Sequence, residues 1–319
     1  MTQTSLRKFV TSLLLTSCLA AAGSASATAY SNMYVFGDSL SDTGNVFALT
    51  GGAYPAAPYS NGRFSNGPTY AQDLAGSLGL PGAAGPSLLG GTNYAFGGAT
   101  AAPGSNISSF ATDLGTQVSM FRALPGAADS HALYVLWAGA NDLRANPTSS
   151  GVGNALTGLS GAVQGLYAEG ARNFLVLNLP NLGLTPESVG QGSSFAAAAT
   201  AGSAGFDAYL TPILASLSAL PGSNIRSLDT FALFTNVVNN PGAYGLSNVT
   251  TPCVSTGTAC ADYLFWDTIH PTAAGHSIIA NAAYQVLVAV PEPETYAMLL
   301  AGLGLLGLLA RRQGRQTLV

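Results

Sequence analysis

The sequence predicts an α/β fold in which about five parallel strands form a sheet with helices on both faces. Short apolar runs alternate along the chain with longer stretches of helical pattern, which is typical of parallel sheets. Polar residues and glycines directly follow several of these runs, where ligands bind in sheets of this kind. Without its two ends, the 319-residue chain is long enough for one large domain with a full core.

The strands are expected in short runs rich in apolar residues, each followed by a loop. They are Met33–Phe36, Thr92–Phe96, His131–Trp137, Asn173–Asn178 and Ile225–Leu228. The helices are expected in longer stretches, and a Gly-Pro pair precedes the first, since proline suits a first helical turn. These stretches are Thr69–Leu78, Gly153–Glu169, Ser194–Leu220 and Ala273–Val288.

The composition excludes some classes of function. The net charge is -4 and only 8% of the residues are charged, which argues against a nucleic-acid-binding protein with its clustered basic face. The chain is rich in small residues but keeps aromatic and branched apolar runs, so it is expected to be globular and not disordered. No metal or organic cofactor is expected.

The N-terminus resembles a secretory signal peptide. Two basic residues precede the apolar run Phe9–Ala22, and overlapping Ala-x-Ala patterns end at Ala27 and Ala29. Residues 1–29 are therefore predicted to be removed on export. The alternatives are a buried N-terminal helix and a lipoprotein signal ending at Cys18, although the sequence after that cysteine stays apolar.

The C-terminus, residues 290–319, contains a Pro-Glu-Pro motif, an apolar run over Tyr296–Ala310, and then Arg311 and Arg312. The run is shorter than the roughly 20 residues of a stable membrane span. This order resembles the PEP-CTERM sorting signal of Gram-negative bacteria. The resemblance implies transient anchoring of the helix in the inner membrane and cutting by an exosortase-type enzyme. The protein would then reach the periplasm, the outer surface or the medium; the alternative is an uncleaved tail anchor.

Two cysteines, Cys253 and Cys260, remain after export. An even pair in an oxidising compartment suggests a disulfide, with two free buried thiols as the alternative. Closing so short a loop would contribute roughly 2–2.5 kcal/mol in the chain-entropy model. The bond would stiffen the chain that leads to Asp267.

A serine nucleophile needs a base within hydrogen-bond reach. Asp267 precedes His270 by three residues, so its carboxylate can orient one ring nitrogen while the other faces the serine, Ser39. His131 is expected to be solvated or to cap a strand, and His276 to pack or hydrogen bond within the last helix. Activity is expected to fall as the pH drops through the histidine pKa, about 6.5 when unperturbed.

An ester hydrolase also needs donors for the oxyanion of its intermediate. The backbone N–H groups of Ser39 and of a glycine after the second strand are candidates, since glycine allows close approach of the backbone to a ligand. The side-chain amide of Asn141 is a third candidate, because it donates without carrying a charge.

Five segments, in chain order, resemble the GDSL (SGNH) hydrolase family. Phe36–Asn45 looks like its first block, Asn93–Ala99 its second, Gly139–Asp142 its third and Asp267–Pro271 its fifth. Tyr59–Pro68 matches a stretch common in the lipase and acylhydrolase branch. A single Gly-Asp-Ser is a weak signal, but several blocks in order are a strong one.

The resemblance implies a flavodoxin-like three-layer α/β/α sandwich over residues 30–289. It also implies that serine is the nucleophile, histidine its base and aspartate the orienting residue, with a glycine and an asparagine in the oxyanion hole. The corresponding residues are Ser39, His270, Asp267, Gly98 and Asn141, although Gly97 adjoins the glycine and leaves that choice open.

Some residues near these motifs are expected to have structural roles. Asp38, Asp42 and Asn45 of the first block are expected to hold its loop by hydrogen bonds. Ser203 lies in a Gly-x-Ser-x-Gly pattern, which in α/β-hydrolases follows a strand and opens a helix. Here it falls within an Ala-rich helical run, so we do not expect it to be the nucleophile.

The function expected from these features is an exported serine esterase or lipase that hydrolyses small-molecule or lipid acyl esters through an acyl-Ser39 intermediate. Deacetylation of an extracellular polysaccharide and acyl transfer use the same residues and are alternatives. A non-enzymatic alternative is an inactive surface or biofilm-matrix protein. The sequence does not determine the length of the acyl chain.

Overall fold

A computed structural model describes residues 30–104, 108–124, 126, 128–256, 259–289 and 301–306. The predicted signal peptide, the Pro-Glu-Pro motif and the terminal arginines lie outside these residues. The folded unit spans residues 30–287, and the described residues 301–306 form a separate helical segment. None of the helices in the described ranges is long and apolar enough to cross a membrane.

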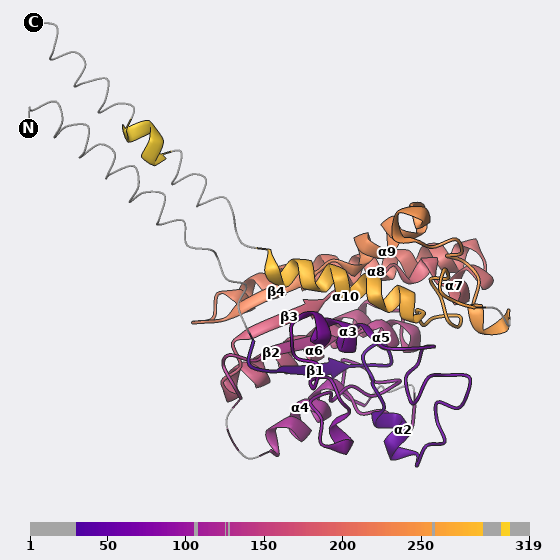
Figure 1. Ribbon diagram of the computed structural model, residues 1–319, viewed down its shortest axis with the longest axis horizontal. Helices are drawn as coiled ribbons and strands as arrows, with labels where there is room; N and C mark the ends of the chain where they lie inside the picture. The colour runs from indigo at the N-terminus through magenta and orange to yellow at the C-terminus, as the bar shows by residue number, and fades with distance from the viewer. Residues whose placement is uncertain are drawn as a thin grey trace, which may run out of the picture. The chain divides into compact units, whose positions relative to one another are not determined.

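The centre of the folded unit is a parallel sheet of four strands, arranged side by side in chain order (Figure 1). The strands are β1 (Met33–Gly37), β2 (Leu133–Trp137), β3 (Asn173–Leu177) and β4 (Asn224–Leu228). All five residues of β2 are buried, which explains its uninterrupted apolar sequence. The fold is α/β with a parallel sheet, as the sequence predicts.

The predicted strand Thr92–Phe96 is not a strand of the sheet, so four strands are present where about five were expected. The segment does run along the free edge of β1 and exchanges three backbone hydrogen bonds with it, but only Val35 and Asn93 form a bridge. The N–H of Asn93 instead donates to Gly85 on the other side. The pairing with β1 therefore does not extend into a ladder, and the segment is a loop.

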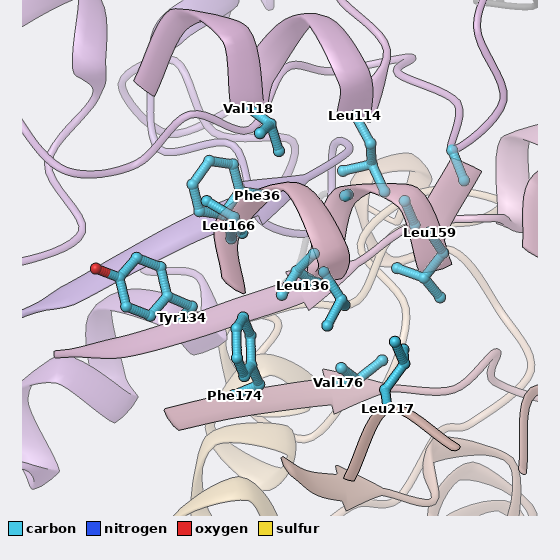
Figure 2. Close-up of a cluster of buried hydrophobic side chains, with 14 of the residues drawn as sticks. Phe36, Leu114, Val118, Tyr134, Leu136, Leu159, Leu166, Phe174, Val176 and Leu217 are labelled. Atoms are coloured by element: carbon cyan, nitrogen blue, oxygen red, sulfur yellow. The ribbon is translucent and has the colours of Figure 1, made fainter. Parts of the chain in front are cut away.

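Helices cover the sheet on both faces. One core packs strand residues against α4 (Leu114–Arg122), α6 (Ser149–Glu169) and α8 (Ser193–Ser218). The opposite core packs the alternate strand residues against α3 (Tyr70–Ser77), α9 (Thr230–Asn239) and α10 (Ala273–Val288). Figure 2 shows the first core, in which Phe36, Leu136 and Val176 of adjacent strands lie in register beneath the helices.

The predicted helices are present with small changes at their ends. The last helix, α10, has the predicted bounds. The first, α3, begins after Thr69, whose N–H donates to the side chain of Gln72, so Pro68 precedes the helix and does not occupy its first turn. Helix α6 begins four residues earlier than predicted, because the side chain of Thr148 caps it.

Several shorter elements were not predicted, nor were α4 and α9. The remaining helices are α2 (Asn45–Leu49), α5 (Ala140–Ala145) and α7 (Pro186–Gly190), with 3-10 turns η1 (Ser87–Leu89), η2 (Leu182–Leu184), η3 (Pro241–Tyr244) and η4 (Cys253–Ser255). Helix α5 follows β2 directly and α7 lies near the start of α8, so both lie close to the carboxyl ends of the strands.

Candidate active site

The Ser39 loop follows directly from β1. A Cβ at Gly37 would lie 2.4 Å from the carbonyl oxygen of Trp137, so only glycine lets the chain leave the sheet this closely. The buried side chain of Gln117 on α4 accepts from the N–H of Gly37 and donates to its carbonyl, both at 2.8 Å. Ser39 therefore follows two residues after a backbone position that is held firmly at the end of β1. Gln117 was not identified from the sequence, because it lies in no local motif.

A buried polar network ties the Ser39 loop to the segment beside β1. The carboxylate of Asp42 accepts four backbone N–H groups, those of Gly44, Asn45, Val46 and Gly97. The side-chain amide of Asn45 donates to the carbonyls of Asn93 and Ala95. Asp42 and Asn45 thus hold the loop by hydrogen bonds, as expected from the sequence.

The two acidic residues of the Ser39 loop, Asp38 and Asp42, are both buried. Burial raises the pKa of Asp38 to about 6, although the N–H of Leu40 favours its charged form. Burial likewise raises the pKa of Asp42 to about 6 against the opposing effect of its backbone donors. Both groups are therefore more easily protonated than an ordinary aspartate.

Folding brings Ser39, His270 and Asp267 into one hydrogen-bonded chain. Nε2 of His270 lies 2.8 Å from Oγ of Ser39, and Nδ1 lies 2.6 Å from Oδ2 of Asp267. A carboxylate can only accept, so Nδ1 carries the proton and Nε2 is free to accept from the serine hydroxyl. The histidine side chain is buried, with 8% of the residue exposed.

Asp267 is suited to stabilise a positive charge on His270. Its Oδ1 accepts the backbone N–H groups of Ile269 and His270. Burial acts to raise the pKa of Asp267, but the hydrogen bonds and the charge of His270 outweigh it and lower the pKa to about 2. The carboxylate is therefore ionised at neutral pH.

Tyr59 was not identified from the sequence as part of the site. Its hydroxyl donates to Oδ2 of Asp267 at 2.7 Å, across 208 residues of chain. The only signal that could have indicated it is its place at the start of Tyr59–Pro68, the segment shared with the lipase branch. That signal marks the segment and does not reveal which side chain reaches the site.

The candidate oxyanion donors differ in whether they are already hydrogen bonded. The N–H of Gly97 donates to Asp42 and is therefore occupied, while the N–H groups of Ser39 and Gly98 make no hydrogen bond among the described residues. Gly98 has a left-handed φ of 83°, which favours glycine. The amide of Asn141 donates one hydrogen to the carbonyl of Ala99 at 2.8 Å.

The other histidines and the competing serine are not part of this hydrogen-bonded chain. His131 is exposed, with its ring 3.6 Å from Asp129. His276 is buried in α10 and stacks on Tyr70, and burial lowers its pKa to about 3. Ser203 is buried inside α8 with its hydroxyl bonded to backbone, so it is not at a strand-to-helix turn.

A cavity of about 610 Å³ opens beside Ser39, Asn141 and His270. Much of its wall is apolar and comes from α5, α6, η2 and α8. Its apolar lining includes Leu143, Val152, Leu182, Phe195 and Ala199. Arg144 and Glu187 also line it and form a two-bond ion pair, at 2.8 and 3.0 Å. The cavity can hold an apolar group next to the serine.

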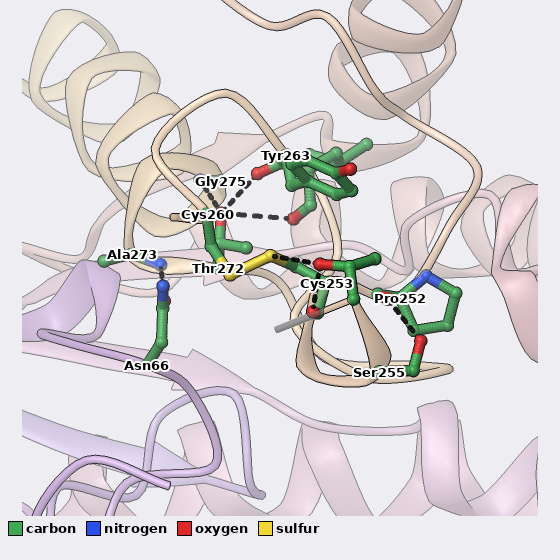
Figure 3. Close-up of a disulfide and its surroundings, with 11 residues drawn as sticks. Asn66, Pro252, Cys253, Ser255, Cys260, Tyr263, Thr272, Ala273 and Gly275 are labelled. Carbon is green, nitrogen blue, oxygen red and sulfur yellow. Dashed lines mark hydrogen bonds between the residues drawn. A yellow bond between two sulfur atoms is a disulfide. The ribbon is translucent and has the colours of Figure 1, made fainter. Parts of the chain in front are cut away.

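Cys253 and Cys260 form a disulfide, with their Cα atoms 5.8 Å apart (Figure 3). The backbone N–H groups of Cys253 and Val254 donate to the carbonyls of Phe265 and Trp266, the two residues before Asp267. The disulfide-bonded turn therefore holds the chain that enters the site. Among the described residues, no cluster of His, Cys, Asp and Glu is suited to bind a metal ion.

Comparisons with known proteins agree with these features. A family model described as GDSL-like Lipase/Acylhydrolase matches residues 33–283, and a PEP-CTERM protein-sorting motif matches residues 289–315. A GDSL esterase/lipase from Arabidopsis thaliana is 28% identical, covering 84% of this chain and 92% of its own. The phosphatidylcholine-sterol acyltransferase of Aeromonas hydrophila is 30% identical, covering 78% and 72% respectively.

Among solved structures, the acetyl xylan esterase AlAXEase matches 79% of this chain and 98% of its own. Its sequence identity is 14% and its TM-score is 0.39.

Proposed function

The chain belongs to the GDSL-like lipase and acylhydrolase family, and from this premise we propose that it is an exported serine esterase with Ser39 as nucleophile. One observation carries the proposal: the serine, histidine and aspartate form an unbroken hydrogen-bonded chain, 2.8 Å and 2.6 Å long at its two links, beside an apolar cavity. This arrangement activates a hydroxyl for attack on a carbonyl carbon.

The reaction proceeds in two steps, acylation of Ser39 and hydrolysis of the acyl-serine. Oγ of Ser39 attacks the ester carbonyl while Nε2 of His270 takes its proton, and Asp267 stabilises the imidazolium that forms. The tetrahedral intermediate collapses, the alcohol leaves with the proton from His270, and the acyl group stays on the serine. Water then attacks the acyl-serine with His270 again as base, which releases the acid and restores the hydroxyl.

The oxyanion of each tetrahedral intermediate is held by the N–H groups of Ser39 and Gly98 and by the amide of Asn141. Gly98 is preferred over Gly97 because the N–H of Gly97 already donates to Asp42. Loss of one such donor typically costs about 2.7–4 kcal/mol of barrier.

The cavity supports an ester with an apolar acyl chain as substrate. A hydrocarbon chain that enters the cavity would bury these apolar side chains, which is favourable. An acetylated sugar would leave most of that wall uncovered. We therefore favour a lipid or small-molecule ester over an acetylated polysaccharide. Acyl transfer to an alcohol remains a second candidate, because a 30% identical relative is named an acyltransferase and the intermediate is the same.

The test is hydrolysis of a series of p-nitrophenyl esters by the purified protein and its Ser39→Ala variant. We expect kcat to fall by at least about a thousandfold in the variant, with its fold unchanged by circular dichroism. Ser203→Ala, the other serine in a glycine-rich context, is the matched control and should retain the rate. Equal rates for Ser39→Ala and the parent protein would remove Ser39 from the mechanism.

The products distinguish hydrolysis from transfer. With a lipid ester and an excess of a long-chain alcohol, an esterase releases mainly free fatty acid. An acyltransferase forms mainly the new ester, because the alcohol replaces water in the second step. Mass spectrometry of the extracted lipids separates these outcomes.

The C-terminal match is to a sorting motif of exported proteins of Gram-negative bacteria. We propose that residues 1–29 are removed as a signal peptide and that the C-terminal helix anchors the chain transiently in the inner membrane. An exosortase-type enzyme would then cut near the Pro-Glu-Pro motif at residues 291–293. The intact mass of the protein from its native cells tests both ends, since an unprocessed chain would retain the full sequence.

A further inference from the structure

Each oxygen of the Asp267 carboxylate receives two hydrogen bonds. Oδ1 accepts from two backbone N–H groups of its own loop, as described above. Oδ2 accepts from Nδ1 of His270 at 2.6 Å and from the hydroxyl of Tyr59 at 2.7 Å. Of these donors, Tyr59 alone comes from a distant part of the chain. It therefore contacts the same oxygen atom that orients the base.

The rest of the Tyr59 segment is bonded to the same loop. The hydroxyl of Ser65 donates to the carbonyl of Pro271 at 2.9 Å. The N–H of Ala273 donates to the side chain of Asn66 at 2.7 Å, a contact visible in Figure 3. The ring of Phe64 lies 5.5 Å from that of His270, centre to centre. Residues 59–66 thus contact the loop before, at and after the histidine, and we call them the clamp.

Tyr59 is itself held firmly. Its ring meets Trp266 edge-on, with centroids 6.0 Å apart, and its N–H donates to the carbonyl of Ala56. The turn that follows is closed by a hydrogen bond from Ser60 to Ser65. Burial and the neighbouring Asp267 carboxylate raise the pKa of Tyr59, so its hydroxyl remains a donor at neutral pH. The position of the donor is therefore fixed by packing and not by Asp267 alone.

We propose that Tyr59 is a positioning residue of the active site, which holds Oδ2 of Asp267 against His270 as the anchor of the clamp. This inference rests on the proposed function, because it assigns a role relative to the Ser39, His270 and Asp267 reaction. Tyr59 does not touch the reacting atoms. It acts on the direction of the imidazole and on the negative charge that faces it.

The hydroxyl has two effects that can be separated. It keeps the carboxylate in the orientation that aims Nε2 at the serine, so its loss lowers kcat. It also draws charge from Oδ2, so its loss leaves more negative charge facing His270 and stabilises the imidazolium. The acid limb of the activity profile should then move to higher pH. The other titratable groups facing His270 are Asp38 on the Ser39 loop and His276 on α10, and neither is changed.

The experiment compares Tyr59→Phe with the parent protein on a p-nitrophenyl ester over a range of pH. We expect kcat to fall about tenfold to a hundredfold, KM to change less than about twofold, and the acid limb to rise by about half a pH unit. Tyr54→Phe is the matched control, because it removes a hydroxyl from the same region that makes no contact with Asp267. It should behave as the parent protein.

Ser65→Ala provides a second variant that leaves Asp267 untouched. It removes a clamp bond to Pro271, so it should lower kcat without moving the acid limb. A merely structural role for Tyr59 predicts the same outcome for both variants, with unfolding free energy reduced and the acid limb unmoved. That result, or parent-like kinetics for Tyr59→Phe, would overturn the inference.

Failure of the inference differs from failure of the proposed function. If Ser39→Ala is inactive and a fluorophosphonate labels Ser39, but Tyr59→Phe matches the parent protein, only the positioning role is wrong. If the parent protein is not labelled and Ser39→Ala has its rate, the proposed function itself is wrong. Should Tyr59→Phe unfold, the acid limb of fluorophosphonate labelling with 4-fluorophenylalanine at position 59, which keeps the ring and fills the place of the hydroxyl but cannot donate a hydrogen bond, gives the same comparison.

Discussion

The side of the site with the proposed nucleophile, residues 37–45 and 92–98, is held differently from the side with the proposed base, residues 59–66 and 265–273; we call them the nucleophile side and the base side. On the nucleophile side, β1 leads directly into the loop, and buried polar side chains bond the loop backbone. On the base side, no strand of the sheet enters the loop, and its partners lie up to 208 residues away. Apart from Ser39 itself, changes on the nucleophile side should therefore cost mainly stability, and changes on the base side mainly activity.

The two sides also differ in their response to acid. On the nucleophile side, the raised pKa values of Asp38 and Asp42 mean that folding favours the protonated form, so their contribution to stability is lost as the pH rises from 3.8 through about 6. On the base side, the lowered pKa of Asp267 means that its contribution is present above 3.8 and lost as the pH falls through about 2. The pKa of the neighbouring His276 is also lowered, so its contribution to stability is likewise lost as the pH falls.

The largest expected effect is on the nucleophile side. Asp42→Ala leaves four backbone N–H groups without an acceptor, each worth roughly 1–3 kcal/mol when buried, so we expect a loss of more than about 3 kcal/mol. Asp42→Asn keeps one acceptor oxygen and should lose less. Urea unfolding at pH 7 measures both.

Asp267→Ala is the matched change on the base side. It should abolish most of the activity at a smaller cost in unfolding free energy, because its loop is closer to solvent and three of its four donors lie within three residues of it. The comparison breaks down if Asp267→Ala destabilises the protein as much as Asp42→Ala does.

The next effect concerns His276. Burial in the folded protein disfavours the protonated form of His276. Its contribution to the free energy of unfolding is therefore fully present above its unfolded pKa of 6.5 and is lost as the pH falls toward its folded pKa of about 3. The parent protein should therefore lose about 2–3 kcal/mol from this group between pH 6.5 and 4.5. His276→Phe keeps an aromatic ring against Tyr70 and removes this loss. Urea unfolding at both pH values measures it.

The exposed His131 is the control for this measurement, and its replacement by Phe should leave the pH dependence as it is. A parent-like acid loss in His276→Phe would show that the acid sensitivity arises elsewhere.

The disulfide is expected to have a slightly smaller effect. Replacing both Cys253 and Cys260 by serine opens a loop with a sequence separation of 7 residues, which should cost about 2–2.5 kcal/mol of unfolding free energy. Because the turn is hydrogen bonded to residues just before Asp267, kcat should fall modestly as well. Thermal unfolding with and without reductant checks the first effect, since a reductant should not shift the midpoint of the double variant.

The smallest expected effect concerns the cavity beside Ser39. Ala199→Phe fills part of the cavity, so kcat/KM for an octanoyl ester should fall about tenfold while that for an acetyl ester stays within about twofold. Ala197→Phe, on the same helix but outside the cavity lining, is the control. An equal loss on both esters would mean that the cavity does not hold the acyl chain.

Local patterns in the sequence were sufficient for much of the fold and part of the site. Alternating apolar runs predicted all four strands, and periodicity predicted α10 with its observed bounds. The three-residue spacing of Asp267 and His270 predicted their contact, because so short a turn leaves the carboxylate few other places to lie. In each case the residues that interact are also close in the chain.

Tertiary structure alone decided the contacts between distant segments. The sequence could not show that Thr92–Phe96 forms an edge loop and not a strand, that Gln117 bonds to Gly37, or that Tyr59 reaches Asp267. The residues of the sequence left the choice between Gly97 and Gly98 open, and our proposal of Gly98 depends on the hydrogen bond between the N–H of Gly97 and Asp42. Such contacts are set by how the layers pack and how long loops close. A single sequence carries no local signal for either.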